Sequence, residues 1–313
     1  MKSTSIDIIT NYSCNFSCEY CFLHKLKSIQ KVIDIGKLRQ QLGEVSSKYK
    51  IDNINIYGGE VSLLPLTYLE QLIGLCSKYA RVNIITNFAD NKCNEFLKQQ
   101  NVTISTSINE ERSCNQQVEY SLLSTDIENL SLIQVVTPSL LSKTPKEVLD
   151  HLELFKKDVG FLQYSPAQMA KVNYNISNMD FSLFMKGIIT EYLSGHYSFE
   201  ISNLDQLESV VEWNYNPRMQ SILFITPFNE YAGISYENYL EHFKVFDKLE
   251  DWELACEQEA IDYNNKCKHC KYYGRCYAEH LKEWKGNDEC CGMKSLVKWY
   301  EENIYQDDRN MQP

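Results

Sequence analysis

The chain has 313 residues, of which 43% are hydrophobic and 12% aromatic, and this composition excludes a disordered, collagen-like or membrane-spanning protein. Its formal net charge of -11, without a visible basic patch, argues against nucleic acid as a partner. Because Met1 to Tyr12 contains one lysine and no long apolar run, it is unlike a signal peptide, and we expect a cytoplasmic protein.

Six short β-rich runs alternate with helical runs through the first two-thirds of the chain, which predicts parallel βαβ units. The predicted strands are Ser5 to Thr10, Asn53 to Tyr57, Val82 to Thr86, Val102 to Ser107, Leu132 to Thr137 and Phe161 to Ser165. The predicted helices are Ile33 to Tyr49, Pro65 to Tyr79, Asn91 to Gln100 and Thr144 to Asp158. Six units are too few to close an eight-stranded barrel, so residues 1–205 predict an α/β fold, a partial parallel (βα)6 barrel whose site lies at the C-terminal ends of its strands.

Beyond this region the regular alternation of predicted strands and helices ends. Ser221 to Thr226 and Tyr231 to Ser235 predict a hairpin around Pro227 to Glu230, and Leu249 to Tyr263 predicts a helix. A group of cysteines follows. Residues 206–313 therefore predict a small C-terminal domain made of a hairpin, a helix and a metal site.

The 12 cysteines are informative, because disulfides are rare in a reducing cytoplasm and clustered thiolates there are candidate metal ligands. Cys14, Cys18 and Cys21 have the spacing C-x3-C-x2-C directly after the first predicted strand. A [4Fe-4S] cluster normally takes four thiolates, so three local cysteines leave one iron open as a reaction site. The alternative is a structural zinc site completed by His24.

This cysteine loop, with Tyr20 before its last cysteine, resembles that of the radical S-adenosylmethionine (SAM) superfamily. Gly58, Gly59 and Glu60 follow the second predicted strand, where the family contacts the methionyl amine of SAM. Glycines allow close backbone approach to a ligand, and a carboxylate complements an ammonium group. The resemblance implies a [4Fe-4S] cluster with an open iron, SAM as cofactor, and cleavage of SAM to methionine and a 5'-deoxyadenosyl radical that abstracts hydrogen from the substrate.

Two later strand ends carry polar residues that fit the same resemblance. Asn87 follows the third predicted strand, and Ser107 and Asn109 lie at the end of the fourth. By resemblance, Ser107 and Asn109 occupy places where the family presents polar groups to the ribose of SAM, although the family often has aspartate at the place of Asn109. Turn formation alone also favours polar residues at strand ends, so both interpretations stand.

A second group of cysteines resembles the C-terminal cluster motifs of the SPASM and twitch subfamilies of radical SAM enzymes. Its members are Cys267, Cys270, Cys276 and Cys290. The cysteines of the other SPASM cluster are missing, since Gly233 and His280 stand near their places. The resemblance therefore implies one auxiliary [4Fe-4S] cluster, closed by Cys290 in preference to Cys291. A structural zinc site that joins His280 to the first three cysteines is the alternative.

An auxiliary cluster suits electron transfer, so the resemblance implies a net oxidation, such as cross-linking or dehydrogenation, of a side chain in a ribosomally made peptide or protein. The implied partners are an electron donor such as flavodoxin or ferredoxin and, because the first strand begins by Ser5, a separate leader-binding protein. A radical SAM oxidoreductase or mutase for a small metabolite is the alternative, and a non-catalytic zinc or iron-sulfur module is a remote one. Asp7 and Gln163 are polar strand residues that could face the barrel interior, but alternation is compatible with either face.

Overall fold

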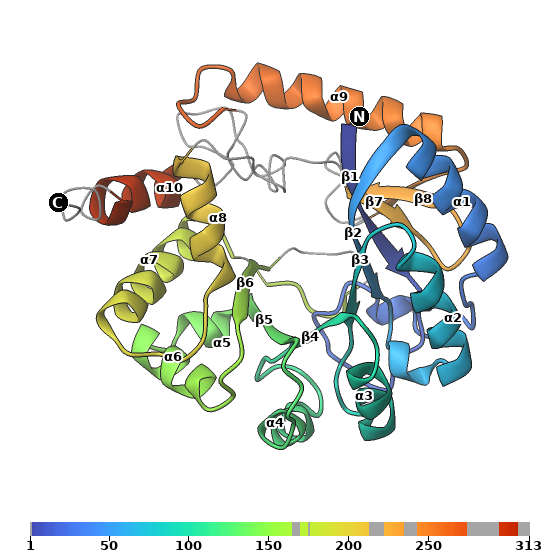
Figure 1. Cartoon of the computed structure of the whole chain (residues 1–313). Helices are drawn as coiled ribbons and strands as arrows, with labels where there is room; N and C mark the ends of the chain where they lie inside the picture. Colours follow the sequence, from blue (N-terminus) through green and yellow to red (C-terminus); the bar gives the residue numbers. More distant parts are fainter. Residues whose placement is uncertain are drawn as a thin grey trace. The chain divides into compact units, whose positions relative to one another are not determined.

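The structure is a computed structural model that describes residues 2–164, 170–174, 176–212, 222–234, 243–273 and 294–305 (Figure 1). The chain divides into two compact units. Unit 1 contains Met1–Ile133, Pro166–Asn173 and Gln220–Cys256. Unit 2 contains Gln134–Ser165, Tyr174–Met219 and Glu257–Pro313. No helix in the described part of the chain has the length and low polarity needed to cross a membrane.

A mostly parallel sheet forms the centre of unit 1. Its strands are β1 (Lys2–Ile9), β2 (Tyr49–Tyr57), β3 (Arg81–Ile85), β4 (Thr103–Ser107), the first part of β5 (Leu130–Val136), β7 (Ile222–Ile225), β8 (Tyr231–Ile234) and β9 (Phe243–Phe246). The hydrogen-bonded order is β6-β5-β4-β3-β2-β1-β7-β8-β9, with β6 at Val159–Gln163. The pairs from β1 to β5 are parallel, as is β1 with β7, whereas β8 is antiparallel to both of its neighbours. The six predicted strands and the predicted hairpin are confirmed, apart from shifted ends.

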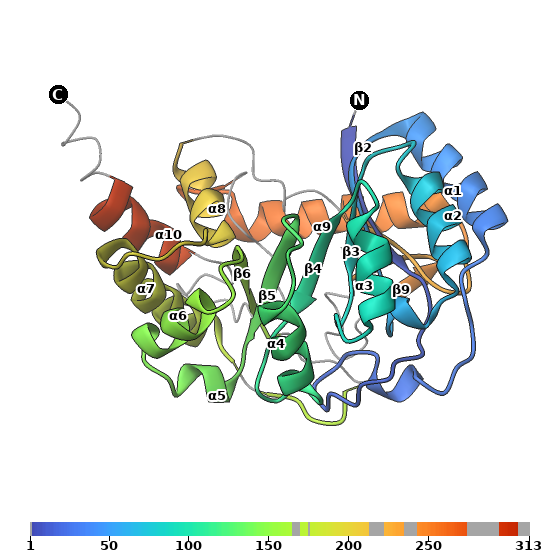
Figure 2. The ribbon, with the colours of Figure 1, turned by 60° about the horizontal axis from the view of Figure 1, so that its bottom comes forward.

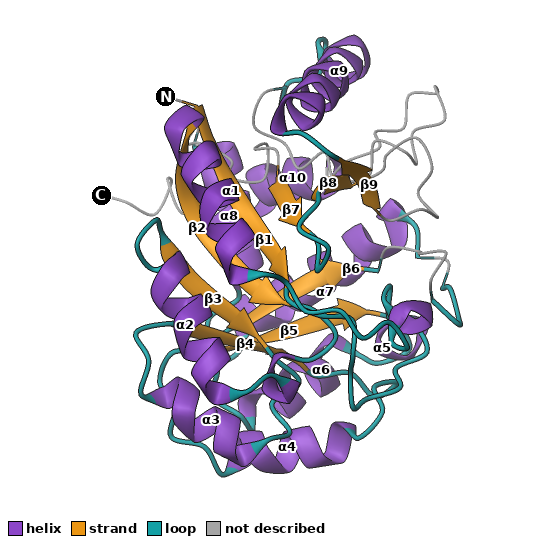
Figure 3. Ribbon diagram, turned by 90° about the vertical axis from the view of Figure 1, so that its right-hand side faces the viewer, coloured by secondary structure: helices purple, strands orange, loops and turns teal. Residues whose placement is uncertain are grey.

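Helices lie along one face of these strands (Figure 1 and Figure 3). They are α1 (Ile35–Lys48), α2 (Leu66–Cys76), α3 (Asn91–Lys98) and α4 (Asn115–Leu123). The side chains of Asp34 and Asp90 cap the first turns of α1 and α3, which is why those helices begin there. The strands turn isoleucines such as Ile54 and Ile84 toward this face, where they are completely buried. This apolar layer fixes the register of the strands, because a slip of one residue would expose it.

Unit 2 is largely helical in its described residues. Its helices are α5 (Pro138–Leu141), α6 (Pro145–Glu153), α7 (Asn178–Ser194), α8 (Ser202–Val211), most of α9 (Leu249–Cys267), α10 (Lys294–Tyr300) and a π-helical turn at Glu301–Tyr305. Figure 2 shows α6, α7 and α10 close together. Capping boxes start α6 at Thr144 and α7 at Ser177. The predicted helix at Leu249 is confirmed and continues to Cys267, into the second cysteine motif.

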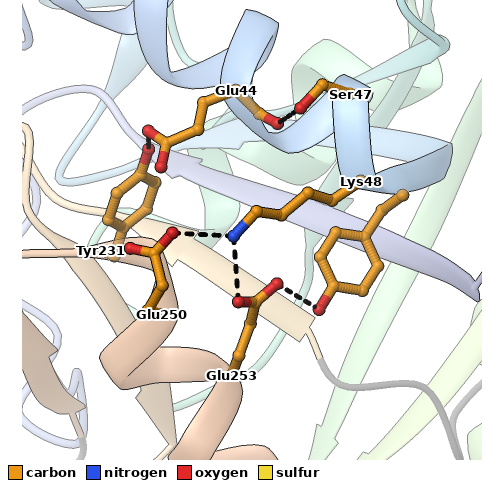
Figure 4. Close-up of polar contacts among 7 residues, drawn as sticks. Glu44, Ser47, Lys48, Tyr231, Glu250 and Glu253 are labelled. Atoms are coloured by element: carbon orange, nitrogen blue, oxygen red, sulfur yellow. Dashed lines mark hydrogen bonds and ion pairs between the residues drawn. The ribbon is translucent and has the colours of Figure 1, made fainter.

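A polar cluster joins the end of α1 to the first turns of α9 within unit 1 (Figure 4). Lys48 Nζ lies 2.8 Å from Glu250 Oε1 and 3.1 Å from Glu253 Oε2. Tyr49 donates a hydrogen bond of 2.8 Å to Glu253 and packs edge-on against the buried ring of Trp252. These contacts fix the start of α9 on the sheet.

We expect the apolar contact in this cluster to matter more than the ion pairs. Lys48→Met should leave the urea midpoint of unfolding nearly unchanged, because exposed ion pairs contribute little to stability. Trp252→Ala should lower the free energy of unfolding by about 3 kcal/mol or more, because it empties a buried aromatic site. Urea unfolding followed by circular dichroism checks both, and a larger loss in Lys48→Met than in Trp252→Ala would contradict the ranking.

Candidate cofactor site

The three cysteines of the first motif lie in one loop that follows β1. Cys18 is buried, and Cys14 and Cys21 are half-buried. The Phe16 amide donates to Cys14 Sγ over 3.4 Å. Burial raises the pKa of Cys14 and of Cys21. Negative charge on Cys21 raises the pKa of Cys14 further, and negative charge on Cys18 does the same to the pKa of Cys21. Cys21 therefore lies within electrostatic reach of both Cys14 and Cys18.

The end of β2 packs directly against the backbone of this loop. Gly59 N donates to Asn11 O over 2.8 Å, and Glu60 N donates to Ser13 O over 2.8 Å. A Cβ atom on Gly59 would lie 2.1 Å from Ser13 O, and one on Gly58 would lie 2.5 Å from Asn11 O. The sequence predicts that these glycines admit a ligand. The structure gives them a further reason, because the cysteine loop itself occupies the space that side chains would need.

The carboxylate of Glu60 joins three segments at this edge of the sheet. It is buried and accepts hydrogen bonds from Thr86 Oγ1 and Asn87 N, each over 2.6 Å, and from Ser62 N over 2.9 Å. The Asn87 side chain continues to Asn15 in the cysteine loop, with Nδ2 2.7 Å from Oδ1. The two carboxylate oxygens thus already have three protein donors, so in this structure Glu60 positions the ends of β2 and β3.

A fourth segment, the loop between β4 and α4, reaches the cysteines from the other side. Ser113 Oγ accepts from Ser17 N over 2.7 Å and lies 3.8 Å from Cys18 Sγ. The guanidinium of Arg112 lies over the Phe16 ring, 5.4 Å from its centroid, and donates to the carbonyl oxygen of Ser107. Neither Arg112 nor Ser113 is predicted from the sequence. The only signal is a cation in a polar loop directly after a predicted strand.

The other predicted cofactor residues lie around this loop. Asn109 is buried and donates through its backbone amide to Asn115 Oδ1 over 3.2 Å. Burial raises the pKa of Tyr20, charge on Cys18 raises it further, and the charge of Arg112 lowers it, so the Tyr20 hydroxyl lies near both groups. The structure thus brings Tyr20, and the ends of β2, β3 and β4, to one edge of the unit 1 sheet, beside the thiols.

The donors at this edge fit an iron-sulfur cluster and a polar cofactor. Among the described residues, no three His, Cys, Asp or Glu side chains form a group that could hold a single metal ion. Thiolates are the usual ligands of iron-sulfur clusters, so the three cysteines of this loop suit one, and a zinc site completed by His24 would use the same thiols. Burial raises the pKa of both Cys14 and Cys21, and the charge of Lys27 opposes that rise. Within the described chain Asn11 Oδ1 is buried without a partner, a vacancy suited to a donor on a bound group.

The second cysteine motif is described only at its beginning. Cys267 ends α9 and Cys270 lies in the following turn, with Cys270 N donating to Cys267 O over 2.8 Å. Both are half-buried. The buried Tyr272 donates to Glu301 over 2.7 Å, which holds this turn against the π-helical turn of unit 2. Four predicted ligands or alternatives lie outside the described residues: Cys276, His280, Cys290 and Cys291.

Comparisons in sequence find two relatives, while no protein-family model matches the chain. The chain is 24% identical over 223 residues to the cysteine-type anaerobic sulfatase-maturating enzyme of Clostridium perfringens. The aligned region covers 58% of this chain and 59% of that protein. It is 39% identical over 61 residues to MJ1632 of Methanocaldococcus jannaschii, which is named as a glycyl-radical enzyme activating enzyme. This aligned region covers 20% of this chain and 23% of that protein. The chain thus matches less than two thirds of either relative.

Two solved structures share the fold. One is anSMEcpe with bound AdoMet, with a TM-score of 0.68 and 18% identity, covering 99% of this chain and 100% of that chain. The other is Streptococcus suis SuiB bound to S-adenosylmethionine, with a TM-score of 0.65 and 14% identity, covering 90% of this chain and 75% of that chain. They confirm the predicted fold class, an α/β partial barrel. Together with the sequence relatives, they support the resemblance to radical SAM enzymes.

Proposed function

We propose that the chain is a radical SAM enzyme that oxidatively modifies a side chain of a ribosomally made peptide or protein. The observation that carries the proposal is the cysteine loop, whose backbone accepts hydrogen bonds from Gly59 and Glu60 and donates one from Ser17 to Ser113, beside Cys18. One site for a cluster and its cofactor is formed by the three thiolates, by the backbone of Gly58 and Gly59 that packs against their loop, and by Asn11 Oδ1, a buried acceptor with no partner among the described residues. The relatives and the shared fold support this assignment.

The proposal assigns roles to residues of this chain. Cys14, Cys18 and Cys21 would hold a [4Fe-4S] cluster with one open iron, and SAM would bind beside it. The proposed SAM-binding residues are Tyr20, Gly58, Gly59, Glu60, Asn87, Ser107 and Asn109. With both groups bound, the reduced cluster would supply the electron that cleaves the sulfonium of SAM and so provide radical chemistry for hydrogen abstraction. The protein has to hold one substrate C-H bond beside that radical and exclude water.

Within the site, the chain's own residues have separate tasks. Glu60 fixes the ends of β2 and β3 under the loop, so that any groups bound there meet backbone in one arrangement. Lys27 holds the loop by donating to Phe16 O over 2.5 Å. Asn11 Oδ1 is the acceptor available for the ammonium of the methionine moiety.

The peptide class of substrate rests on the proteins that share the fold. One structure of anSMEcpe holds AdoMet with a Cp18Cys peptide, and one of SuiB holds the precursor peptide SuiA. We infer that residues 206–313 form an auxiliary cluster domain in which Cys267, Cys270, Cys276 and Cys290 bind one [4Fe-4S] cluster. The enzyme would then work in the cytoplasm with flavodoxin or ferredoxin as electron donor.

The direct test is anaerobic reconstitution with iron and sulfide, followed by assay with SAM and dithionite. Formation of 5'-deoxyadenosine is the expected result, and its absence from cluster-loaded protein would reject the enzyme assignment. A short precursor peptide encoded beside this gene is the first substrate to assay. Conversion of that peptide to a product lighter by two hydrogens supports an oxidative modification of the peptide, and an unchanged mass in every such peptide contradicts it.

A variant of the second motif tests the auxiliary cluster. We expect Cys270→Ala to retain formation of 5'-deoxyadenosine but to give no oxidised peptide, because the substrate electron then has no acceptor. Mass spectrometry of the peptide, with nucleoside analysis of the same sample, checks the uncoupling. Cys256→Ala, a change of a half-buried thiol on α9, is the control and should give product. Product at the normal rate in Cys270→Ala would show that the auxiliary assignment is wrong.

A further inference from the structure

The two faces of the unit 1 sheet differ in polarity. On β1, Ile6 and Ile8 are completely buried on the face that packs against the helices, whereas Ser5 and Asp7 alternate with them and are half-buried. The same alternation continues on β2 and β3, where Asn55 and Asn83 are half-buried beside buried isoleucines. Asp7 therefore lies on the face opposite α1 to α4. Strand alternation in the sequence alone is compatible with either face for this residue.

The polar side chains on this face form one continuous hydrogen-bonded row across five strands. Its members are Asp7 on β1, Asn55 on β2, Asn83 on β3, Ser105 on β4 and Ser131 on β5. They are register partners except between β3 and β4, where Asn83 is paired with Thr103 and Ser105 lies two residues further along the strand. Asn55 Nδ2 donates to Asp7 Oδ1 over 2.7 Å, and Asn83 Nδ2 donates to Asn55 Oδ1 over 3.2 Å. Ser105 Oγ donates to Asn83 Oδ1 over 3.1 Å and lies 2.9 Å from Ser131 Oγ.

The direction of these bonds makes Asp7 the terminus of the row. From β4 to β1 each donor points toward β1, so each bond polarises the next and the carboxylate accepts at the end. Tyr57 also donates a hydrogen bond to Asp7, while the strand on the other side places the buried Phe224 opposite it. Within the described residues, no lysine, arginine or histidine forms an ion pair with Asp7. Asp7 is therefore a half-buried acid whose donors in the described part of the chain, Asn55 and Tyr57, are neutral.

Such an acid is poorly stabilised as an anion. Burial raises the pKa of Asp7 from its ordinary value to about 6, against the opposing hydrogen bonds from Asn55 and Tyr57. A carboxylate away from water is best stabilised by an opposite charge with hydrogen-bond donors. Its position also suits a ligand: Asp7 lies two residues before the end of β1, and Tyr57 directly precedes Gly58. This is the C-terminal edge of the parallel strands, where α/β proteins bind their ligands.

We propose that Asp7, backed by this polar row, binds a cationic side chain of the substrate, the guanidinium of an arginine or the ammonium of a lysine. The inference rests on the proposed function and narrows its substrate class to peptides with a basic residue at or beside the modified position. Asn55 and Tyr57 hold the carboxylate in place, and the row keeps their donors directed at it. Asp7 positions the substrate and takes no part in the cleavage of SAM.

The experiment uses cluster-loaded protein with SAM and measures modification of individual carboxyl groups. A water-soluble carbodiimide with glycinamide labels accessible carboxyls, and peptide mass spectrometry reports the label on Asp7 and on Asp52. Ethylguanidinium is the cationic probe, and N-ethylurea is its neutral counterpart of similar shape. We expect Asp7 to be labelled, and ethylguanidinium to protect it at a concentration at least about tenfold below that of N-ethylurea. Asp52, paired with Lys50 on the same strand as Asn55, should not show this difference.

A variant supplies the second measurement. Saturation-transfer nuclear magnetic resonance should detect bound ethylguanidinium with the wild type and with Asp52→Asn, and at least about tenfold less with Asp7→Asn. Circular dichroism first confirms that both variants are folded. An unlabelled Asp7, equal protection by the two probes, or undiminished binding to Asp7→Asn would each overturn the inference. Wild-type protein that forms 5'-deoxyadenosine but fails these tests overturns the Asp7 assignment alone, whereas absence of 5'-deoxyadenosine overturns the proposed function.

Discussion

Cys18→Ala is expected to abolish formation of 5'-deoxyadenosine from SAM. Cys18 is the buried member of the three cysteines, and Ser113 holds its part of the loop. A cluster that keeps only two of the three thiolates of this loop lacks a ligand that it needs. Iron and sulfide content should fall together with the absorbance of the cluster. Nucleoside analysis after incubation with SAM and dithionite should detect no product above the level of a protein-free control.

Cys114→Ala is the matched control for this prediction. Cys114 is an exposed thiol in the loop between β4 and α4, next to Ser113, and it precedes the first turn of α4. Its loss removes one thiol from the same region without touching the proposed ligands, so cluster content and SAM cleavage should stay near the wild-type level. Full cluster content and cleavage in Cys18→Ala would show that the thiols of this loop do not bind the cluster.

Much of the fold can be predicted because its signals are local. Isoleucines that alternate with polar residues mark β1 and β2, and Asp34 and Asp90 precede the first residues of α1 and α3. The start of β2 is predicted four residues late, at Asn53, because Lys50 and Asp52 give a polar pattern. In the structure Tyr49 pairs with Lys2, so the partner strand extends β2 beyond its own apolar residues. Such extensions come from tertiary pairing and have no signal in the strand itself.

The helices of unit 2 were less well predicted. The sequence predicts the segment that contains α6 but neither α7 nor α8. In α7 the capping signal was present, since Ser177 and Asp180 form a capping box. Its apolar residues, however, extend around much of the helix, with Leu183 exposed and Phe184 buried. A helix of this kind lacks a clear amphipathic period, so the burial that stabilises it becomes visible only in the tertiary structure.

For the candidate site, residues within short motifs were predictable and contacts between distant segments were not. The spacing of Cys14 to Cys21 and the Gly-Gly-Glu segment are visible in the chain. Ser113 reaches Ser17 and Cys18 across more than ninety residues of sequence, and Thr86 reaches Glu60 across 26. No single-sequence pattern records such contacts. The sequence therefore indicates which residues bear the chemistry, and the structure adds those that hold them in position.

Gly59→Ala is expected to displace the cysteine loop, because the end of β2 packs directly against the backbone of that loop. The added Cβ would lie 2.1 Å from Ser13 O and 2.5 Å from Tyr12 O. Both neighbours are backbone oxygens in the segment that leads into Cys14, so no side-chain rotation can relieve the overlap. The loop must move away, which breaks the hydrogen bonds from Gly59 to Asn11 and from Glu60 to Ser13.

We expect Gly59→Ala to lower the free energy of unfolding by about 2 kcal/mol or more, since overpacking against rigid neighbours is costly. Cluster content should fall as well, because the displaced segment positions Cys14. Gly74→Ala is the control: Gly74 lies within α2 with no atom within 4 Å of its added Cβ, so alanine should be neutral or stabilising by about 0.5–1 kcal/mol. Urea unfolding and iron analysis of both variants check the pair. Equal stability and equal iron content in the two would mean that the loop tolerates displacement, and that the glycine is required by the bound cofactor alone.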